Sequence, residues 1–360
     1  MKRFYLFILF LVVSAGASAQ LTTCAQTLRL ANSTYEQGRL HELPDLLAKC
    51  LESGFNQQEK VQAYKLLTLA YIYLEEPEKA DETMLKILET DNYFTINKDI
   101  DPAEFIALYN TFRTKPIFRL GVHFLLNSSQ PNVAMFNPIS DGTGKYSYKI
   151  GVGAGIGGEL PVNIPFLKNR TTLAGELNYL TKSFTNQFNS LSPNGISYAT
   201  STGVETQNWI SLPVMLQYRL FKKNELSPAT RWMERLNPYL SLGVSASYLL
   251  SSNTSVDLKR TGNQSIDLQT VSLSLQREKF NLSALASAGI KSRIASGFLV
   301  AEVRYVYGIS KVNSASTLYD NQVLLNNYKL VDGIFSLNSL FFKVGYVQNF
   351  FNPKKLKRKK

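Results

Sequence analysis

Residues 297–310 have the sequence GFLVAEVRYVYGIS, and residues 336–350 have the sequence SLNSLFFKVGYVQNF. Successive side chains of a β-strand point to opposite faces, so alternate positions divide each segment into two faces. In the first segment one face is apolar and aromatic, whereas Glu302 and Arg304 lie on the other. The second segment also has an apolar face, and Lys343 lies on the opposite one. Both segments therefore pair a continuous apolar face with a charged face.

Segments of this kind recur along the chain. Repeated strands of about ten residues, with apolar faces and aromatic ends, are typical of transmembrane β-barrels. After the N-terminal segment no apolar run of about twenty residues offers a transmembrane helix, and a bilayer-spanning chain without such helices has to close a barrel. We therefore predict an eight-stranded antiparallel transmembrane β-barrel over residues 115–351. Its strands should begin near Ile117, Tyr148, Thr171, Asn208, Asn237, Lys279, Gly297 and Ser336.

The alternation also predicts what fills the barrel. An eight-stranded barrel is only wide enough for side chains to occupy its interior, so inward charges of both signs should pair and close the lumen. Gly151, Gly153, Gly155 and Gly157 fall on the inner face and would make room for long side chains; that they line a small ligand cavity is the alternative. The predicted lumen charge network consists of Arg119, Glu176, Arg219, Lys291, Glu302, Arg304 and Lys343.

Connection lengths predict an orientation. Residues 128–147, 183–207, 251–278 and 311–335 are long, rich in Ser, Asn, Thr and Gly, and expected to be outward loops. Shorter segments such as 159–170 are expected to be periplasmic turns. An even strand number returns the C-terminus to the side where the chain enters the barrel.

The N-terminal segment indicates export. Residues 1–19 combine Lys2 and Arg3, an apolar run and an Ala-Ser-Ala exit, the pattern of a secretory signal peptide. We expect an outer-membrane protein in contact with outer-membrane lipid. The net charge of +12 is dispersed except in a basic tail at 352–360, so nucleic acid is not an expected partner. That tail is either solvated or in contact with anionic headgroups or an acidic partner.

Residues 20–114 differ from the rest, because their apolar residues follow a helical period. We predict a small periplasmic helical domain with helices at 24–37, 40–53, 57–75, 77–90 and 102–113, the last capped by Asp101. The spacing resembles tetratricopeptide (TPR) repeats; a plain helical bundle is the equal alternative. The TPR-like positions are Tyr64, Leu67, Tyr71, Ala80, Met84 and Ile87, with a weaker copy at Leu28, Ala31, Tyr35 and Gly38.

The chain has two cysteines. Cys24 opens the first predicted helix and Cys50 lies near the end of the second, so an antiparallel pairing of these helices would bring the thiols together. In the oxidising periplasm this favours a disulfide. Two buried free thiols remain the alternative.

Chemical signals are scarce. The histidines are His41, on a helix, and His123, on an inward strand position. This leaves little material for a metal site or a histidine-based catalytic triad, and no nucleotide-binding or hydrolase motif is present. We predict no catalytic activity, no cofactor and no metal, and interpret His123 as a hydrogen-bonding residue of the lumen.

Three stretches resemble the PorT-like outer-membrane β-barrel family of Bacteroidetes: Ile210-Ser-Leu-Pro-Val-x-x-Gln-Tyr-Arg219, Asn237-Pro-Tyr-Leu-Ser-Leu-Gly243, and Gly289-Ile-Lys291 with Gly297-Phe-Leu299. The resemblance covers about the last two thirds of the chain. It implies an outer-membrane barrel, and the family's namesake implies an accessory role in type IX protein secretion. It carries no catalytic residues.

Two functions remain open. In the first, the barrel anchors a periplasmic helical domain that binds a periplasmic or outer-membrane protein in secretion, gliding or envelope assembly. In the second, a small barrel acts as an envelope enzyme or binds a lipid or small ligand, working from His123 and the inward carboxylates. The absence of a catalytic cluster favours the first.

Overall fold

The computed structural model describes residues 24–135, 143–162, 164–167, 170–191, 197–221, 236–260, 265–294 and 296–356. The chain divides into two compact units. One consists of Met1–Pro116 together with Phe351–Lys360, and the other is Ile117–Phe350. The first unit is helical and the second is a β-barrel.

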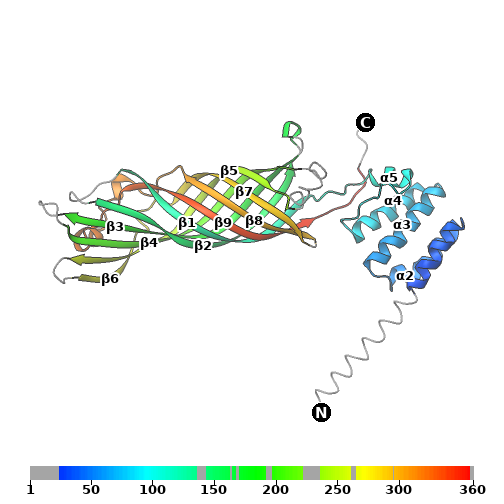
Figure 1. Ribbon diagram of the computed structural model, residues 1–360, viewed down its shortest axis with the longest axis horizontal. Helices are drawn as coiled ribbons and strands as arrows, with labels where there is room; N and C mark the ends of the chain where they lie inside the picture. The colour runs from blue at the N-terminus through cyan, green and yellow to red at the C-terminus, as the bar shows by residue number, and fades with distance from the viewer. Residues whose placement is uncertain are drawn as a thin grey trace, which may run out of the picture. The chain divides into compact units, whose positions relative to one another are not determined.

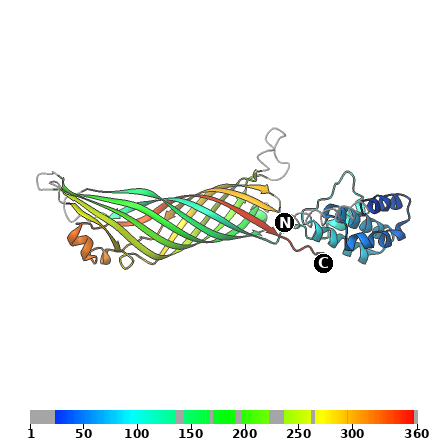
Figure 2. The same cartoon turned by 90° about the horizontal axis from the view of Figure 1, so that it is seen from below.

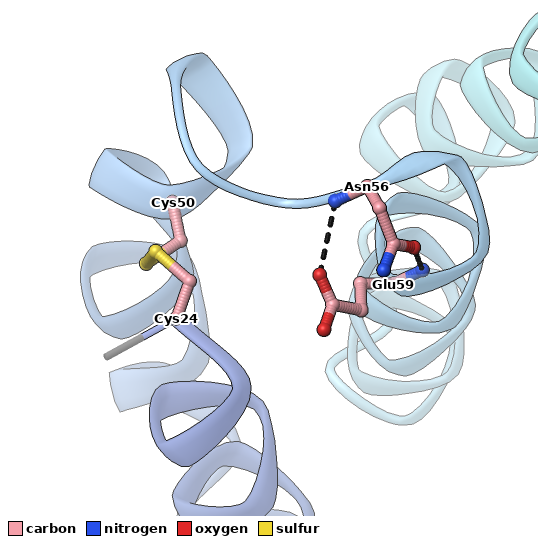
Figure 3. Close-up of a disulfide and its surroundings, with 4 residues drawn as sticks. All are labelled: Cys24, Cys50, Asn56 and Glu59. Atoms are coloured by element: carbon pink, nitrogen blue, oxygen red, sulfur yellow. Dashed lines mark hydrogen bonds between the residues drawn. A yellow bond between two sulfur atoms is a disulfide. The ribbon is translucent and has the colours of Figure 1, made fainter. Parts of the chain in front are cut away.

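The helices of the first unit begin at recognisable sequence signals. The side chain of Asn56 accepts a hydrogen bond from the backbone of Glu59, whose carboxylate accepts one from Asn56 in return, so α3 starts with a capping box (Figure 3). Pro77 starts α4, where a missing N–H costs nothing. The described helices of this unit fall within the segments predicted to be helical: residues 24–36, η1 Leu40–Glu42, α2 Leu43–Glu52, α3 Gln57–Tyr73, α4 Pro77–Thr90 and α5 Ala103–Tyr109.

Among the described helices, none is both long and apolar enough to cross a membrane.

Asp101 does not cap the last helix, as the sequence suggested. The residue before α5 is Pro102, and the Asp101 side chain is buried. Its Oδ1 accepts a hydrogen bond from Nζ of Lys65 at 2.5 Å, and its Oδ2 accepts one from the backbone N of Asn97 at 2.7 Å. The carboxylate thus joins α3 to the loop before α5, because an ion pair with a neighbouring helix satisfies it better than a cap.

The C-terminal segment completes the helical unit. The backbone N of Arg113 donates to the carbonyl of Lys354 at 2.9 Å, and Phe112 and Lys355 form an isolated antiparallel bridge. The ring of Phe351 meets Tyr93 edge to face. Lys355 also forms an ion pair with Asp81 of α4. Residues 351–356 therefore contact the helices, although most of their side chains are exposed; the rest of the predicted basic tail lies outside the described residues.

The second unit is a closed ring of eight antiparallel strands in the order β1, β2, β3, β4, β5, β7, β8, β9, closed by pairing of β9 with β1 (Figures 1 and 2). A further strand, β6, pairs only with β5, next to the ring. The strands are β1 Phe118–Met135, β2 Thr143–Val162, β3 Thr171–Leu191, β4 Ser197–Arg219, β5 Tyr239–Arg260, β6 Ser265–Ser272, β7 Phe280–Ile294, β8 Gly297–Gly308 and β9 Ile334–Phe350.

An apolar belt covers the outer face of the ring at the positions that the alternation predicted. Strand pairing brings these side chains into register; Tyr179 of β3 and Tyr248 of β5 both lie opposite Ile210 of β4. Exposed members of the belt include Val122, Phe124, Ile150, Val152, Leu177, Tyr179, Leu212, Leu242, Val244, Tyr248, Phe280, Leu282, Val303, Tyr305, Leu340 and Phe342.

The predicted outward loops were largely wrong, because most of their described residues belong to strands. In β3, Leu177 and Tyr179 are exposed within the belt, whereas Phe184 and Phe188 beyond it are buried. Outward positions beyond the belt are mostly polar, as at Gln130 of β1, although Met135 and Leu268 are exposed there. The strands thus continue past the belt with the polarity of a water-soluble protein, apolar inside and polar outside. We call this part the extension.

The end of the extension is closed by the chain itself. The segment between β8 and β9 contains η4 Ala315–Thr317 and α7 Gln322–Asn327, which Figure 2 shows in orange at the barrel end opposite the start of β1. From this segment Leu324 and Tyr328 pack into a hydrophobic cluster with Val256 and Leu258. A segment that the sequence indicated as a loop is therefore a folded plug.

Candidate functional site

A network of four charged residues crosses the lumen at the level of the belt. Arg304 of β8 donates to both carboxylate oxygens of Glu176 of β3, at 2.8 and 2.7 Å, and to Oε1 of Glu302 at 2.8 Å. Nζ of Lys343 on β9 lies 2.8 Å from Glu176 and 2.8 Å from Glu302. All four side chains are buried. Two cations and two carboxylates thus neutralise one another in the centre of the barrel.

His123 is adjacent to this network. Its Nε2 lies 2.7 Å from Oδ1 of Asn178 and 3.7 Å from Oε2 of Glu176. Asn178 in turn donates to Glu176 at 3.1 Å. The ring is 7% exposed. This places the imidazole among lumen hydrogen bonds and away from bulk solvent.

A second group of charges lies where the chain enters and leaves the barrel. Glu159 of β2 accepts hydrogen bonds from Arg119 at 3.2 Å and from Lys291 at 2.5 Å. Lys291 also donates to the side-chain carbonyl of Gln217 at 2.7 Å. The exposed Arg219 forms no ion pair among the described residues, although it belongs to the predicted network. We call this end of the lumen the basic mouth.

Glu159 was missed by the sequence prediction because it was placed in a turn that began there. The alternation along the strand could have revealed it. Glu159 comes two residues after Gly157, so it falls on the same inner face as Gly151, Gly153, Gly155 and Gly157. The strand continues to Val162, so the alternation continues as well.

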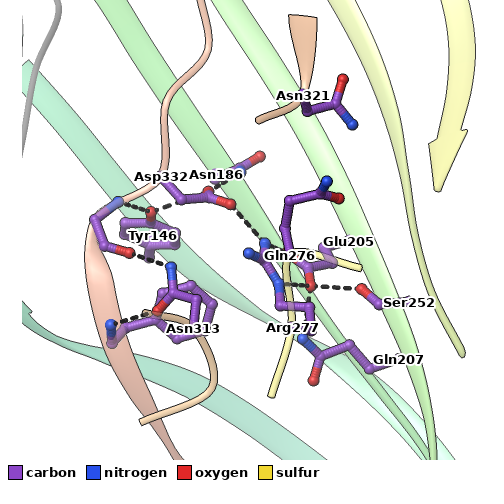
Figure 4. Close-up of polar contacts among 12 residues, drawn as sticks. Tyr146, Asn186, Glu205, Gln207, Ser252, Gln276, Arg277, Asn313, Asn321 and Asp332 are labelled. Carbon is purple, nitrogen blue, oxygen red and sulfur yellow. Dashed lines mark hydrogen bonds and ion pairs between the residues drawn. The ribbon is translucent and has the colours of Figure 1, made fainter. Parts of the chain in front are cut away.

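A third charged cluster holds the plug in the extension (Figure 4). Arg277 donates to both oxygens of Glu205, at 2.8 and 2.6 Å, and to Oδ2 of Asp332 at 2.5 Å. Oδ1 of Asp332 accepts from Asn186 at 3.0 Å and from the Tyr146 hydroxyl at 3.3 Å. Burial disfavours the charge of Arg277, but the two carboxylates raise its pKa above the usual value. The sequence did not predict this cluster, since each charged member lay in a presumed loop.

Only small spaces remain between these clusters. Three cavities in the lumen have volumes of about 60, 20 and 30 Å³. A water molecule takes up about 30 Å³ in the liquid, so each cavity holds one or two waters at most. In the described part of the barrel, side chains therefore fill the lumen along the belt, and no open channel passes between them.

In the helical unit, Cys24 and Cys50 form a disulfide that joins the first helix to α2 across a sequence separation of 26 (Figure 3). Both residues are buried beside Leu28 and Phe55. The bond covalently links the two N-terminal helices of the unit.

Within the described ranges, no group of three or more His, Cys, Asp or Glu side chains is placed to hold a metal. His41 is exposed on η1, remote in sequence from His123. The buried carboxylates are already engaged by Arg and Lys. The described carboxylates of the lumen are thus arranged as ion pairs.

Residues 117–314 match the family model described as "Outer membrane protein beta-barrel domain". The chain belongs to this family. It is accordingly an outer-membrane barrel. The chain matches no curated protein.

Several solved outer-membrane barrels are similar to the chain. Neisserial surface protein A is 13% identical with a TM-score of 0.30, covering 64% of this chain and 97% of its own. OprG from Pseudomonas aeruginosa is 10% identical with a TM-score of 0.30, covering 66% and 97%. Ail of Yersinia pestis, solved with a heparin analogue, is 13% identical with a TM-score of 0.28, covering 64% and 98%. Family membership rests on the match over residues 117–314.

Proposed function

We propose that the protein is a non-enzymatic outer-membrane anchor whose helical unit faces the periplasm and binds a protein partner there. The observation that carries the proposal is the filled lumen. Among the described residues, its ion pairs leave no open channel and no exposed reactive group, which supports a working surface elsewhere. The helical unit, with its own core and disulfide, is the remaining candidate.

The two barrel ends support this orientation. The extension has a polar exterior and a closing plug, which suits the cell surface. The opposite end is where the chain passes from the helical unit into β1 and from β9 back to it. A periplasmic helical unit follows if the extension faces outward.

The kind of partner is suggested by two resemblances. A TPR-like arrangement of α3 and α4 would present helix faces to an extended segment of another protein. The PorT-like pattern in the strands suggests protein secretion of the type IX kind, gliding or envelope assembly as the process served. Exposed apolar side chains on the helical unit include Leu30, Tyr73 and Ile100, each more than half exposed.

An envelope enzyme is the alternative. It would work from His123, the one lumen histidine among the described residues. The imidazole is 7% exposed and bonded to Asn178, so a substrate would have to displace the central network to reach it. A barrel that binds a lipid or small ligand at one end does not require access to His123.

Site-specific photocrosslinking in intact cells tests the anchor proposal. A photoreactive amino acid replaces Tyr73 on the helical unit or Tyr305 on the belt, two tyrosines that are 53% and 48% exposed. We expect a discrete protein adduct from position 73 and only lipid adducts from position 305.

The partner in the adduct is then identified by mass spectrometry. A complementation assay accompanies the crosslinking. The His123→Ala variant should insert normally and complement a deletion strain, because under this proposal the imidazole has no role beyond filling the lumen. Absence of protein adducts at Tyr73, Leu30 and Ile100 together with a dead His123→Ala would favour the enzyme.

A further inference from the structure

The basic mouth contains a cavity of about 60 Å³ bordered by side chains from six strands. Among the lining residues are the cations Arg119, Arg170, Arg219 and Lys291, and none of the lining residues is acidic. The remaining lining residues are Thr172, Gln217, Asn237, Tyr239 and Phe298. The cavity is thus surrounded by positive charge.

The charges at this cavity do not cancel. Arg119 and Lys291 share a single carboxylate, Glu159. Arg219 has no carboxylate within ion-pair distance in the described part of the chain, although its backbone N is hydrogen-bonded to Arg170. These three cations and one carboxylate leave two positive charges. The central network, by contrast, balances two cations with two carboxylates.

Several of the hydrogen-bonding groups left over at the mouth are donors. The side-chain carbonyl of Gln217 is engaged by Lys291, which leaves its amide nitrogen as a donor. Arg119 uses Nε for Asn349 and Nη1 for Glu159, so Nη2 remains. The guanidinium of Arg219 adds further N–H groups in a fork that matches two oxygens of one anion. A ligand for these groups has to be an acceptor.

We propose that the basic mouth binds a phosphate group. A phosphate carries a charge of about −2 at neutral pH and accepts several hydrogen bonds at once, which suits two uncompensated cations and several free donors. A carboxylate would leave one cation uncompensated. The cavity has room for about two waters, or for one small tetrahedral oxyanion in their place.

Two sources can supply this chemistry: a soluble phosphate of the surrounding compartment or the phosphomonoester headgroup of a phospholipid such as phosphatidic acid. The phosphate site does not depend on the proposed anchoring function. The anchoring proposal matters only for the compartment that this end of the barrel faces, which it gives as the periplasm. Failure of phosphate binding and failure of partner capture are therefore separate results.

The test uses the full-length protein in a zwitterionic detergent, titrated with inorganic phosphate at constant ionic strength and followed by isothermal calorimetry. We expect saturable binding of one phosphate by the unmodified protein. Arg219→Gln should weaken it by about tenfold or more, as loss of one charge-assisted contact implies. Arg260→Gln is the matched control, because Arg260 is an exposed arginine at the far end of β5.

Arg219→Lys separates charge from geometry and should restore binding only in part, since lysine cannot form the fork. Nanodiscs of phosphatidylcholine with or without phosphatidic acid then distinguish the sources. If the lipid headgroup occupies the mouth, discs with phosphatidic acid should no longer take up free phosphate; if a soluble phosphate is the ligand, uptake should be equal in both. No saturable binding in detergent, or equal binding by Arg219→Gln and Arg260→Gln, would overturn the proposal.

Discussion

Arg304 on β8 and Glu176 on β3 share two hydrogen bonds across the lumen, Nη1 to Oε2 at 2.8 Å and Nη2 to Oε1 at 2.7 Å. These strands are not neighbours in the ring, because β2, β1 and β9 separate them on one side. The pair therefore braces parts of the wall that no backbone ladder joins. Its removal should affect the whole barrel rather than one edge.

Loss of an inward carboxylate should destabilise the barrel. Glu302→Leu removes the acceptor of Arg304, Lys343 and the Tyr239 hydroxyl and leaves buried positive charge uncompensated. We expect the free energy of unfolding to fall by about 3–5 kcal/mol. Urea unfolding in phospholipid vesicles measures it. The outward neighbour Val303→Leu should change it by less than about 0.5 kcal/mol; equal tolerance of the two changes would mean that the lumen is wet.

The inner glycines should differ in their tolerance of a methyl group. A Cβ at Gly155 would lie 2.6 Å from the carbonyl oxygen of Leu177 and 2.8 Å from Nε2 of His123, whereas one at Gly157 would lie 3.4 Å from its nearest neighbour, Cγ of Glu176. Gly155→Ala should therefore lower stability by about 1–3 kcal/mol through overpacking. Gly157→Ala should cost clearly less. Electrophoretic mobility of unheated samples across a temperature series compares the two.

Arg277 should control the plug. Arg277→Gln removes the cation that Glu205 and Asp332 share, so two buried carboxylates should separate and release the segment between β8 and β9. Hydrogen exchange in α7 should rise and surface protease should cut there. Lys311→Gln, at an exposed position of the same segment, is the control and should behave like the unmodified protein. Unchanged protection in Arg277→Gln would show that the apolar cluster alone holds the plug.

The disulfide should stabilise only the helical unit. Closing a loop with a sequence separation of 26 is worth about 3–4 kcal/mol in the chain-entropy account. Cys24→Ser and Cys50→Ser should each lose about this much, and the double variant should lose little more, since one change already opens the ring. Thermal unfolding of the helical signal, with and without reductant, measures the effect. Two reactive thiols in protein extracted without reductant would contradict it.

The sequence predicted the part of the barrel that contacts lipid better than the extension. Inside the belt the bilayer requires apolar side chains at outward positions. The alternation therefore assigns Val303 to the outer face and Glu302 to the inner face. Beyond the belt Phe184 and Phe188 point inward and polar residues point outward. A prediction that relies on an apolar outer face therefore does not recognise these parts of the strands. Strand β6 and the plug were missed for the same reason.

The charge network could be predicted in part from the sequence for a related reason. Parity alone placed Glu176, Arg304 and Lys343 on the inner face, and in a narrow barrel inward charges have to meet. The alternation could not show that Arg219 forms no ion pair with the described carboxylates. Ion pairing across the lumen depends on which strands face each other around the ring, and the alternation within one strand does not show this. Nor could it place Asp101, whose partner Lys65 comes from another helix.

The bridge between Phe112 and Lys355 has a consequence for how the protein is made. Synthesis and export deliver the helices first and their last structural piece after every strand of the barrel. Until Phe351 and Lys355 arrive, Tyr93 and Asp81 on the helical unit lack their contacts. A truncated or stalled polypeptide therefore cannot display the finished helical unit, and maturation of that unit reports that translocation of the whole chain is complete.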